Sequence, residues 1–81
     1  MADLLRKIEQ LASEANALKV TTVRVKLGAL SHITPEHFRE HFQQAIKGTI
    51  AEGAVLDVEQ SQDEHDPNAQ DILLDSVDIA T

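Results

Sequence analysis

The sequence predicts an α+β fold in which two amphipathic helices pack on one face of a small three-stranded mixed sheet, in the order α-β-α-β-β. Three observations predict it. Two segments repeat their apolar residues at helical spacing, and three segments carry the short apolar patterns of strands. A chain of 81 residues with only two phenylalanines as aromatic residues has to build one small core from aliphatic side chains. Two layers let the helices and the sheet bury their apolar sides against each other.

The first expected element is a helix over residues 3–18, with Asp3 as a plausible N-cap. Its apolar residues recur at three- and four-residue steps, which places them on one stripe at 3.6 residues per turn. They are Leu4, Leu5, Ile8, Leu11, Ala12, Ala15 and Leu18. The segment therefore predicts an amphipathic helix that buries one side.

Residues 22–27 follow as the first strand, because apolar and polar residues alternate strictly there. Val23, Val25 and Leu27 then share one face, which should point toward the core. A short connection beginning at Gly28 leads from this strand to the second helix.

The second helix should run from Thr34 to about Lys47. Thr34 can cap the start with Pro35 at the first helical position, and Gly48 can end it in a left-handed conformation. The stripe that this helix should bury consists of Phe38, Phe42, Ala45 and Ile46.

Two more strands complete the expected sheet, over residues 54–60 and 72–79, with the acidic segment 61–70 as the loop between them. In the first of these strands Leu56 and Val58 should point inward. In the second, the expected inward residues are Leu73, Val77 and Ile79.

Charge and composition exclude several classes of protein. The net charge of −7 speaks against nucleic-acid binding, which needs lysine and arginine at the phosphates, and favours basic partners. The chain has no apolar run of membrane-spanning length and no signal-peptide pattern, so we expect a cytoplasmic protein with no membrane role. The absence of cysteine excludes disulfides and thiolate chemistry, and speaks against structural zinc.

The stretch HFREH in the second helix is the candidate metal site. His37 and His41 are four residues apart and share one side of a helix, so both imidazoles can reach one ion, and His32 is the nearest candidate for a third ligand. The stretch also matches the His-x-x-Glu-His pattern of inverted zinc peptidases, but a chain this short does not build their substrate cleft. The alternative is a solvated helix flank, since Phe38 and Phe42 fix the buried side.

Other reactive residues give weaker patterns. His65 lies among acidic residues in the loop 61–70, which is more typical of a solvated segment than of a cation site. No serine stands in a Gly-x-Ser-x-Gly turn, and the glycines are too far apart for a phosphate-binding loop. The sequence therefore predicts that the protein is not an enzyme.

Two blocks resemble a known family. Gly28-Ala29-Leu30-Ser31 after the first strand, and Gly48-Thr49-Ile50-Ala51-Glu52-Gly53-Ala54 after the second helix, are similar to the hydrogenase and urease nickel-insertion protein family of the HypA/HybF type. The resemblance runs from about Leu4 to Glu59. It implies a nickel-binding domain of two helices on a small mixed sheet, with a zinc domain inserted before the final strand. It also implies delivery of nickel to the hydrogenase large subunit together with a partner GTPase.

Two functional parts of the family pattern are not matched. The family binds nickel through a Met-His-Glu start, whereas this chain reads Met1-Ala2-Asp3, and the four zinc-binding cysteines are missing. We therefore expect residues 1–81 to form a single domain that resembles the family's nickel-binding domain, with the loop 61–70 in place of the zinc domain.

Two hypotheses for function follow from this resemblance. In the first, the protein is an accessory factor of nickel-enzyme maturation that holds nickel through His37, His41 or His32, or assists a metalloenzyme or GTPase partner that holds it. In the second, it is a metal-free protein-interaction module on the same scaffold. We also hypothesise a weak homodimer through the open sheet, because Val55 and Leu74 should point outward.

Overall fold

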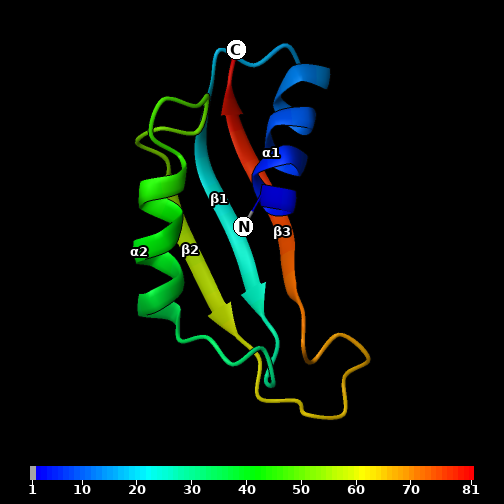
Figure 1. The fold of residues 1–81 in the computed structure, drawn as a ribbon. Helices are drawn as coiled ribbons and strands as arrows, with labels where there is room; N and C mark the ends of the chain where they lie inside the picture. Colours follow the sequence, from blue (N-terminus) through cyan, green and yellow to red (C-terminus); the bar gives the residue numbers. More distant parts are fainter. Residues whose placement is uncertain (1) are drawn as a thin grey trace.

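The structure of the protein, a computed structural model that describes residues 2–81, confirms the predicted α+β class and element order. Figure 1 shows how the helices lie on the sheet, with α2 alongside β2 and α1 alongside β3. The elements are α1 (Ala2–Glu14), β1 (Lys19–Leu27), α2 (Pro35–Ala45), β2 (Val55–Gln60) and β3 (Ile72–Ala80).

The sheet is mixed and has the strand order β2-β1-β3. β1 in the centre pairs in parallel with β2 and antiparallel with β3. A parallel neighbour requires a long crossover connection, and the segment containing α2 supplies it between β1 and β2. Both β2 and β3 are therefore edge strands.

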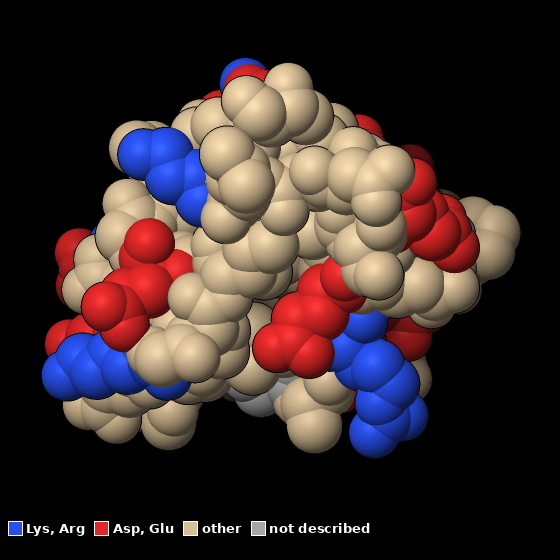
Figure 2. All heavy atoms as spheres, turned by 90° about the horizontal axis from the view of Figure 1, so that it is seen from above, with Lys and Arg blue, Asp and Glu red and all other residues tan. Residues whose placement is uncertain are grey.

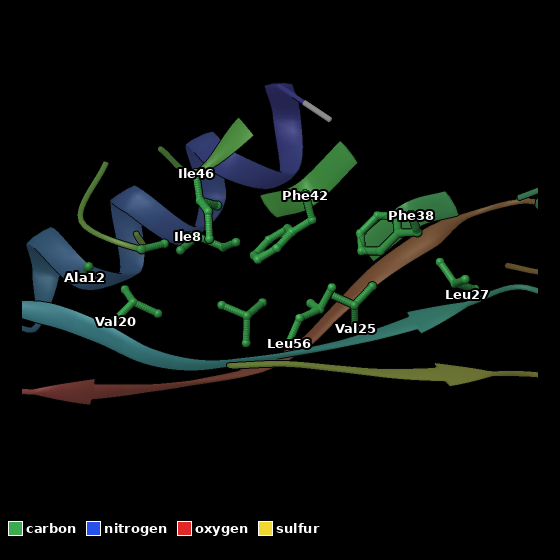
Figure 3. Packing of buried hydrophobic residues seen from close by; sticks show 11 residues of the cluster. Ile8, Ala12, Val20, Val25, Leu27, Phe38, Phe42, Ile46 and Leu56 are labelled. Carbon is green, nitrogen blue, oxygen red and sulfur yellow. The ribbon is translucent and has the colours of Figure 1, made fainter. Parts of the chain in front are cut away.

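The core lies between the sheet and the two helices, and Figure 3 shows its side chains projecting from both layers toward each other. Val23, Val25 and Leu27 are buried as predicted. The stripe of α2 is also confirmed through Phe38 and Phe42. The buried cluster consists of Ile8, Ala12, Val20, Val23, Val25, Leu27, Phe38, Phe42, Ile46, Ala51 and Leu56.

The first helix is shorter at its C-terminal end than predicted. α1 ends at Glu14 instead of Leu18, because Asn16 adopts a left-handed conformation (φ 53°) that stops the helix. Leu18 is 79% exposed and its N–H donates to Ala80 O at 2.8 Å, so this residue already leads into the sheet. It lies in the connection at the top of Figure 1, an end of the molecule that uncharged residues largely cover (Figure 2). Asp3 also differs from prediction, since α1 begins before it and Asp3 lies inside the first turn.

The second helix begins as predicted. The hydroxyl of Thr34 accepts a hydrogen bond from the His37 N–H at 3.1 Å, and Pro35 occupies the first turn. α2 ends at Ala45, two residues before the predicted Lys47, and Gly48 takes the expected left-handed conformation at φ 78°.

The inward residues of β3 differ from prediction at one position. Leu73 is exposed and Leu74 packs against the core, because the register of β3 shifts between Leu74 and Ser76, so that Leu74 and not Asp75 pairs with Val25. Strict alternation back from Val77 would have pointed Asp75 into the core, where an unpaired carboxylate is costly. A β-bulge avoids this cost by leaving Asp75 exposed.

This bulge also removes one of the two observations behind the predicted homodimer. Leu74 faces the helices and is half-buried, so it does not lie on the open face. Val55 is exposed as predicted, with 64% of its surface accessible.

The loop after β2 packs back against the end of β1. Gly28 N–H donates to Asp71 O at 2.9 Å, and Leu30 N–H donates to Ala69 O at 2.7 Å. A Cβ atom on Gly28 would lie 2.2 Å from Ala69 O, so only glycine fits this contact. The acidic loop is thus attached to the fold by backbone hydrogen bonds.

Neither helix within residues 2–81 has the length and apolar character needed to cross a bilayer.

The histidine pair and the groove between the helices

The two histidines of the HFREH stretch lie side by side on α2. The rings of His37 and His41 stack with their centroids 4.6 Å apart and their planes at 28°. Both residues are exposed. The local sequence fixes this arrangement, because the buried rings of Phe38 and Phe42 set the rotation of the helix and leave the histidines on its flank.

A groove of about 600 Å³ runs between α1 and α2, and His41 lies on the α2 side of it. Asp3 contributes a carboxylate from the first turn of α1, so an imidazole and an acid share the groove. Most of the remaining lining is apolar. The lining residues are Asp3, Leu4, Ile33, Phe38, His41, Gln44, Ala45 and Ile72.

Asp3 has a partner on its own helix. Its carboxylate lies 3.6 Å from the Arg6 guanidinium, and both side chains are almost entirely solvated. Such an exposed pair contributes little to stability. The Asp3 carboxylate is therefore held only loosely. Its place in the same groove as His41 was missed in the sequence, where Asp3 was treated only as a cap.

The candidate third ligand, His32, lies in the connection between β1 and α2. It is exposed and adopts a left-handed conformation with φ 60°. Among residues 2–81, no three histidine, aspartate or glutamate side chains converge on a point where they could hold one ion. The structure thus brings His37 and His41 together and leaves His32 apart from them. His65 lies in the loop, where its N–H donates to Asp63 Oδ1 at 3.0 Å.

The opposite face of the sheet carries a network of charged residues that the sequence pattern indicated only as a polar face. Arg24 donates to Asp78 Oδ2 at 2.9 Å and to Ser76 Oγ at 3.3 Å. The hydrogen bond from Arg24 lowers the pKa of the Asp78 carboxyl below its ordinary value. The same bond raises the pKa of the Arg24 guanidinium, to which the nearby charges of Asp57 and Asp75 also contribute.

Fold and site together define a small α+β protein with an exposed histidine pair on α2 and a groove between its two helices. Residues 1–66 match the family model described as hydrogenase/urease nickel incorporation, metallochaperone, HypA. This match covers more than half of the chain, and the protein belongs to that family, as the resemblance of the glycine-containing blocks predicted.

Curated relatives support the assignment. The hydrogenase maturation factor HypA of Archaeoglobus fulgidus is 46% identical over 55 residues, which cover 68% of this chain and 50% of the relative. The HypA of Salmonella typhimurium is 40% identical over 60 residues, which cover 74% of this chain and 51% of the relative. The chain thus spans about half the length of the curated relatives that it matches.

A solved structure has the same fold. The solution structure of the Ni metallochaperone HypA from Helicobacter pylori superposes with a TM-score of 0.78, covering 98% of this chain and 92% of that chain. At 16% sequence identity, this likeness concerns the arrangement of helices and strands.

Proposed function

We propose that this protein is an accessory factor in the maturation of nickel metalloenzymes, hydrogenase in particular, and acts as a metallochaperone and not as a catalyst. The observation that carries this proposal is the family match over residues 1–66. Relatives are named hydrogenase maturation factors, and the structural neighbour is titled a Ni metallochaperone. The protein partner would be a metalloenzyme precursor or a maturation GTPase, and the compartment the cytoplasm.

Nickel would be the cargo, and we propose that His37 and His41 contact it. Imidazole nitrogens are suitable ligands for Ni²⁺, and two histidines one helical turn apart can bind a single ion. Their rings lie 4.6 Å apart on an exposed flank, so rotation of both side chains would turn their nitrogens toward one ion. The remaining coordination positions would be filled by water or by the receiving protein, which suits an ion that has to be released.

His32 is the third candidate ligand in this proposal. It would reach the pair only if the connection between β1 and α2 moved, since the side chains among residues 2–81 do not converge as they stand. The pair alone is therefore the simpler arrangement, and removal of His32 should weaken binding less than removal of the pair.

Calorimetric titration of the tag-free protein with Ni²⁺ and with Zn²⁺ tests this site. We expect stoichiometric Ni²⁺ binding with a Kd below about 10 µM, equivalent to roughly 7 kcal/mol, and its loss in the double variant His37→Ala/His41→Ala. His65→Ala is the matched control, because it removes an exposed histidine from the loop 61–70, outside α2. Baseline heat with the unchanged protein, or equal loss in the control, would reject the pair as the nickel contact.

We further propose that residues 1–81 correspond to the nickel-binding domain of the family, with the loop 61–70 in place of a zinc domain. The backbone hydrogen bonds from Gly28 and Leu30 support the correspondence, because they hold the connection between β2 and β3 against the end of β1. Limited proteolysis tests this proposal, and one resistant fragment is expected. Early cleavage inside the loop 61–70 would show that the loop is not held against the sheet.

The second candidate function is a metal-free interaction module. The apolar lining of the groove between α1 and α2 favours it, because apolar surface beside a few polar groups is typical of binding sites. Leu4→Trp would fill the groove from the α1 side and leave both histidines of α2 unchanged. Loss of hydrogenase-precursor binding in this variant, together with unchanged Ni²⁺ titration, would favour docking over metal transfer.

A weak homodimer is a further proposal, now supported only by the exposed Val55 on β2. Sedimentation at increasing protein concentration tests it, with Val55→Lys as the variant that should abolish association. A strict monomer would reject it.

A further inference from the structure

The outer edge of β3 is an open strand edge. Within the described residues 2–81, β3 pairs with β1 alone, on its inner side. The carbonyls of Asp78 and Ala80 face β1, since Thr21 Oγ1 donates to Asp78 O at 3.1 Å and Leu18 N–H donates to Ala80 O at 2.8 Å. Successive residues of an antiparallel strand point their backbone groups to alternate sides. Val77 and Ile79 therefore present their N–H and C=O groups at the free edge.

The other edge strand, β2, has one of its backbone acceptors occupied by a side chain. Arg39 of α2 donates from Nη1 to Leu56 O at 2.8 Å, so a guanidinium occupies one of the acceptors of β2. A charged side chain placed on an edge strand hinders pairing with another chain. Among residues 2–81, no hydrogen bond engages the outer edge of β3 between Leu73 and Ile79. Figure 3 shows α1 above the plane of the strands, on the side of the sheet that carries the core.

The charges along β3 indicate what this edge would accept. Asp75 is exposed at the bulge, and Asp78 lies further along the strand on the open face of the sheet. Both lie near Arg24, whose guanidinium also interacts with the charge of Asp57 on β2. Three carboxylates thus surround one guanidinium, and β3 itself carries no lysine or arginine. The edge of β3 is therefore an acidic edge.

We propose that the free edge of β3 is a docking edge for an extended basic segment of a partner protein, which adds as a fourth strand. The backbone groups of Val77 and Ile79 would pair with the incoming strand, and its alternate lysine or arginine side chains would lie beside Asp75 and Asp78. Strand addition supplies the affinity through backbone hydrogen bonds, and the two carboxylates supply the preference for a basic sequence. This inference goes beyond the proposed function and does not depend on metal binding, because the histidine pair lies on α2 over the opposite edge.

A second copy of the chain fits this edge less well. Antiparallel pairing of two β3 strands would bring the Asp75 and Asp78 side chains of both copies onto neighbouring strands of one face. Like charges directly opposite each other destabilise a strand pair. The charge pattern therefore favours a basic partner over self-association at neutral pH.

The test uses the full chain and a synthetic peptide as long as β3, with lysine at alternate positions and valine or threonine between them. We expect the peptide to bind and to slow amide hydrogen exchange at Val77 and Ile79, with no change in β2. The same peptide with glutamate in place of lysine should bind at least about tenfold more weakly, and added salt should weaken binding of the lysine peptide. Failure to bind, or protection of β2 instead, would overturn the proposal.

Variants of the protein complete the test. Asp75→Asn should weaken peptide binding several-fold without loss of fold, because Asp75 is exposed at a bulge, whereas the matched control Asp57→Asn on β2 should leave binding within about twofold of the unchanged protein. Equal effects of the two substitutions would overturn the assignment to β3. Sedimentation of the chain alone at high concentration should show no dimer that pairs through β3, and amide protection at Val77 and Ile79 on self-association would overturn the choice of a basic partner.

Discussion

The two faces of the sheet differ in how they are stabilised. The face under the helices is apolar and dry, with Val23 and Phe42 fully buried. The opposite face carries Arg24 and acidic neighbours, and the Arg24–Asp78 pair is partly exposed to solvent. Burial of apolar area stabilises the fold through the first face, while charge pairs in water contribute little through the second. The second face can therefore be changed for binding at little cost to folding, and the following substitutions test this difference.

The largest expected effect comes from the covered face. Phe42→Ala removes a fully buried ring that lies between the sheet and α2, and should lower the free energy of unfolding by roughly 3–5 kcal/mol. Urea unfolding followed by circular dichroism measures it, with Arg24→Ala on the open face as the comparison, expected at about 1 kcal/mol or less. Similar losses for the two variants would contradict the difference between the faces.

The next effect arises where the sheet meets the loop. Gly28→Ala places a methyl group against Ala69 O, so either the loop moves or the end of β1 does, at a cost of roughly 1–3 kcal/mol. Faster proteolysis within the loop 61–71 should accompany the lower stability. Gly53→Ala is not equivalent, because Gly53 has open space around it and its strain comes from a positive φ. If Gly28→Ala leaves both stability and proteolysis unchanged, the contact does not hold the loop.

A smaller effect separates two adjacent leucines of β3. Leu74→Ala should cost about 1–2 kcal/mol, because Leu74 packs against the core, while Leu73→Ala should stay within about 0.5 kcal/mol. Chemical denaturation of both variants measures the difference. A larger loss of stability for Leu73→Ala than for Leu74→Ala would contradict the bulge and support strict alternation in β3.

The smallest effect is a dependence on pH. The pKa of Asp78 is lowered from its ordinary value of 3.8 by the Arg24 hydrogen bond, so the pair stabilises the folded state above that value and loses the effect as the pH falls through the lowered pKa. Asp78→Asn should therefore be slightly less stable than the unchanged protein at pH 7 and equal to it in strong acid. Thermal unfolding across this range measures it, and a difference that grows toward acid would have the wrong sign.

Much of the fold was predictable because the signals are local. The two ends of α2 are marked by the cap at Thr34, by Pro35 in the first turn and by the left-handed Gly48. The buried rings of Phe38 and Phe42 determine which side of the helix faces the core. The bulge of β3 was missed although Asp75 signals it, since strict alternation places a carboxylate in the core. The early end of α1 depends on Asn16, which has no such signal in the periodic pattern.

The site was predictable only in part. The spacing of His37 and His41 gave their shared side, but the position of Asp3 across the groove depends on how α1 lies relative to α2. Such a relation between distant segments has no periodic trace in the sequence. The sequence likewise does not show that β3 is an edge strand, because this depends on the strand order of the folded sheet.

Both ends of the connection between β2 and β3 are tied to the same point of the sheet. Ser61 N–H donates to Leu27 O at 2.8 Å, and Gly28 N–H donates to Asp71 O at 2.9 Å, so two consecutive residues of the chain hold the connection where it leaves and where it returns. The registers of β2 and β3 are therefore set independently of what lies between these two anchors. The cost of closing a longer loop rises by only about 0.6 kcal/mol for each doubling of its length. Evolution can thus add or remove a whole module at this end of the sheet while the rest of the protein keeps its shape.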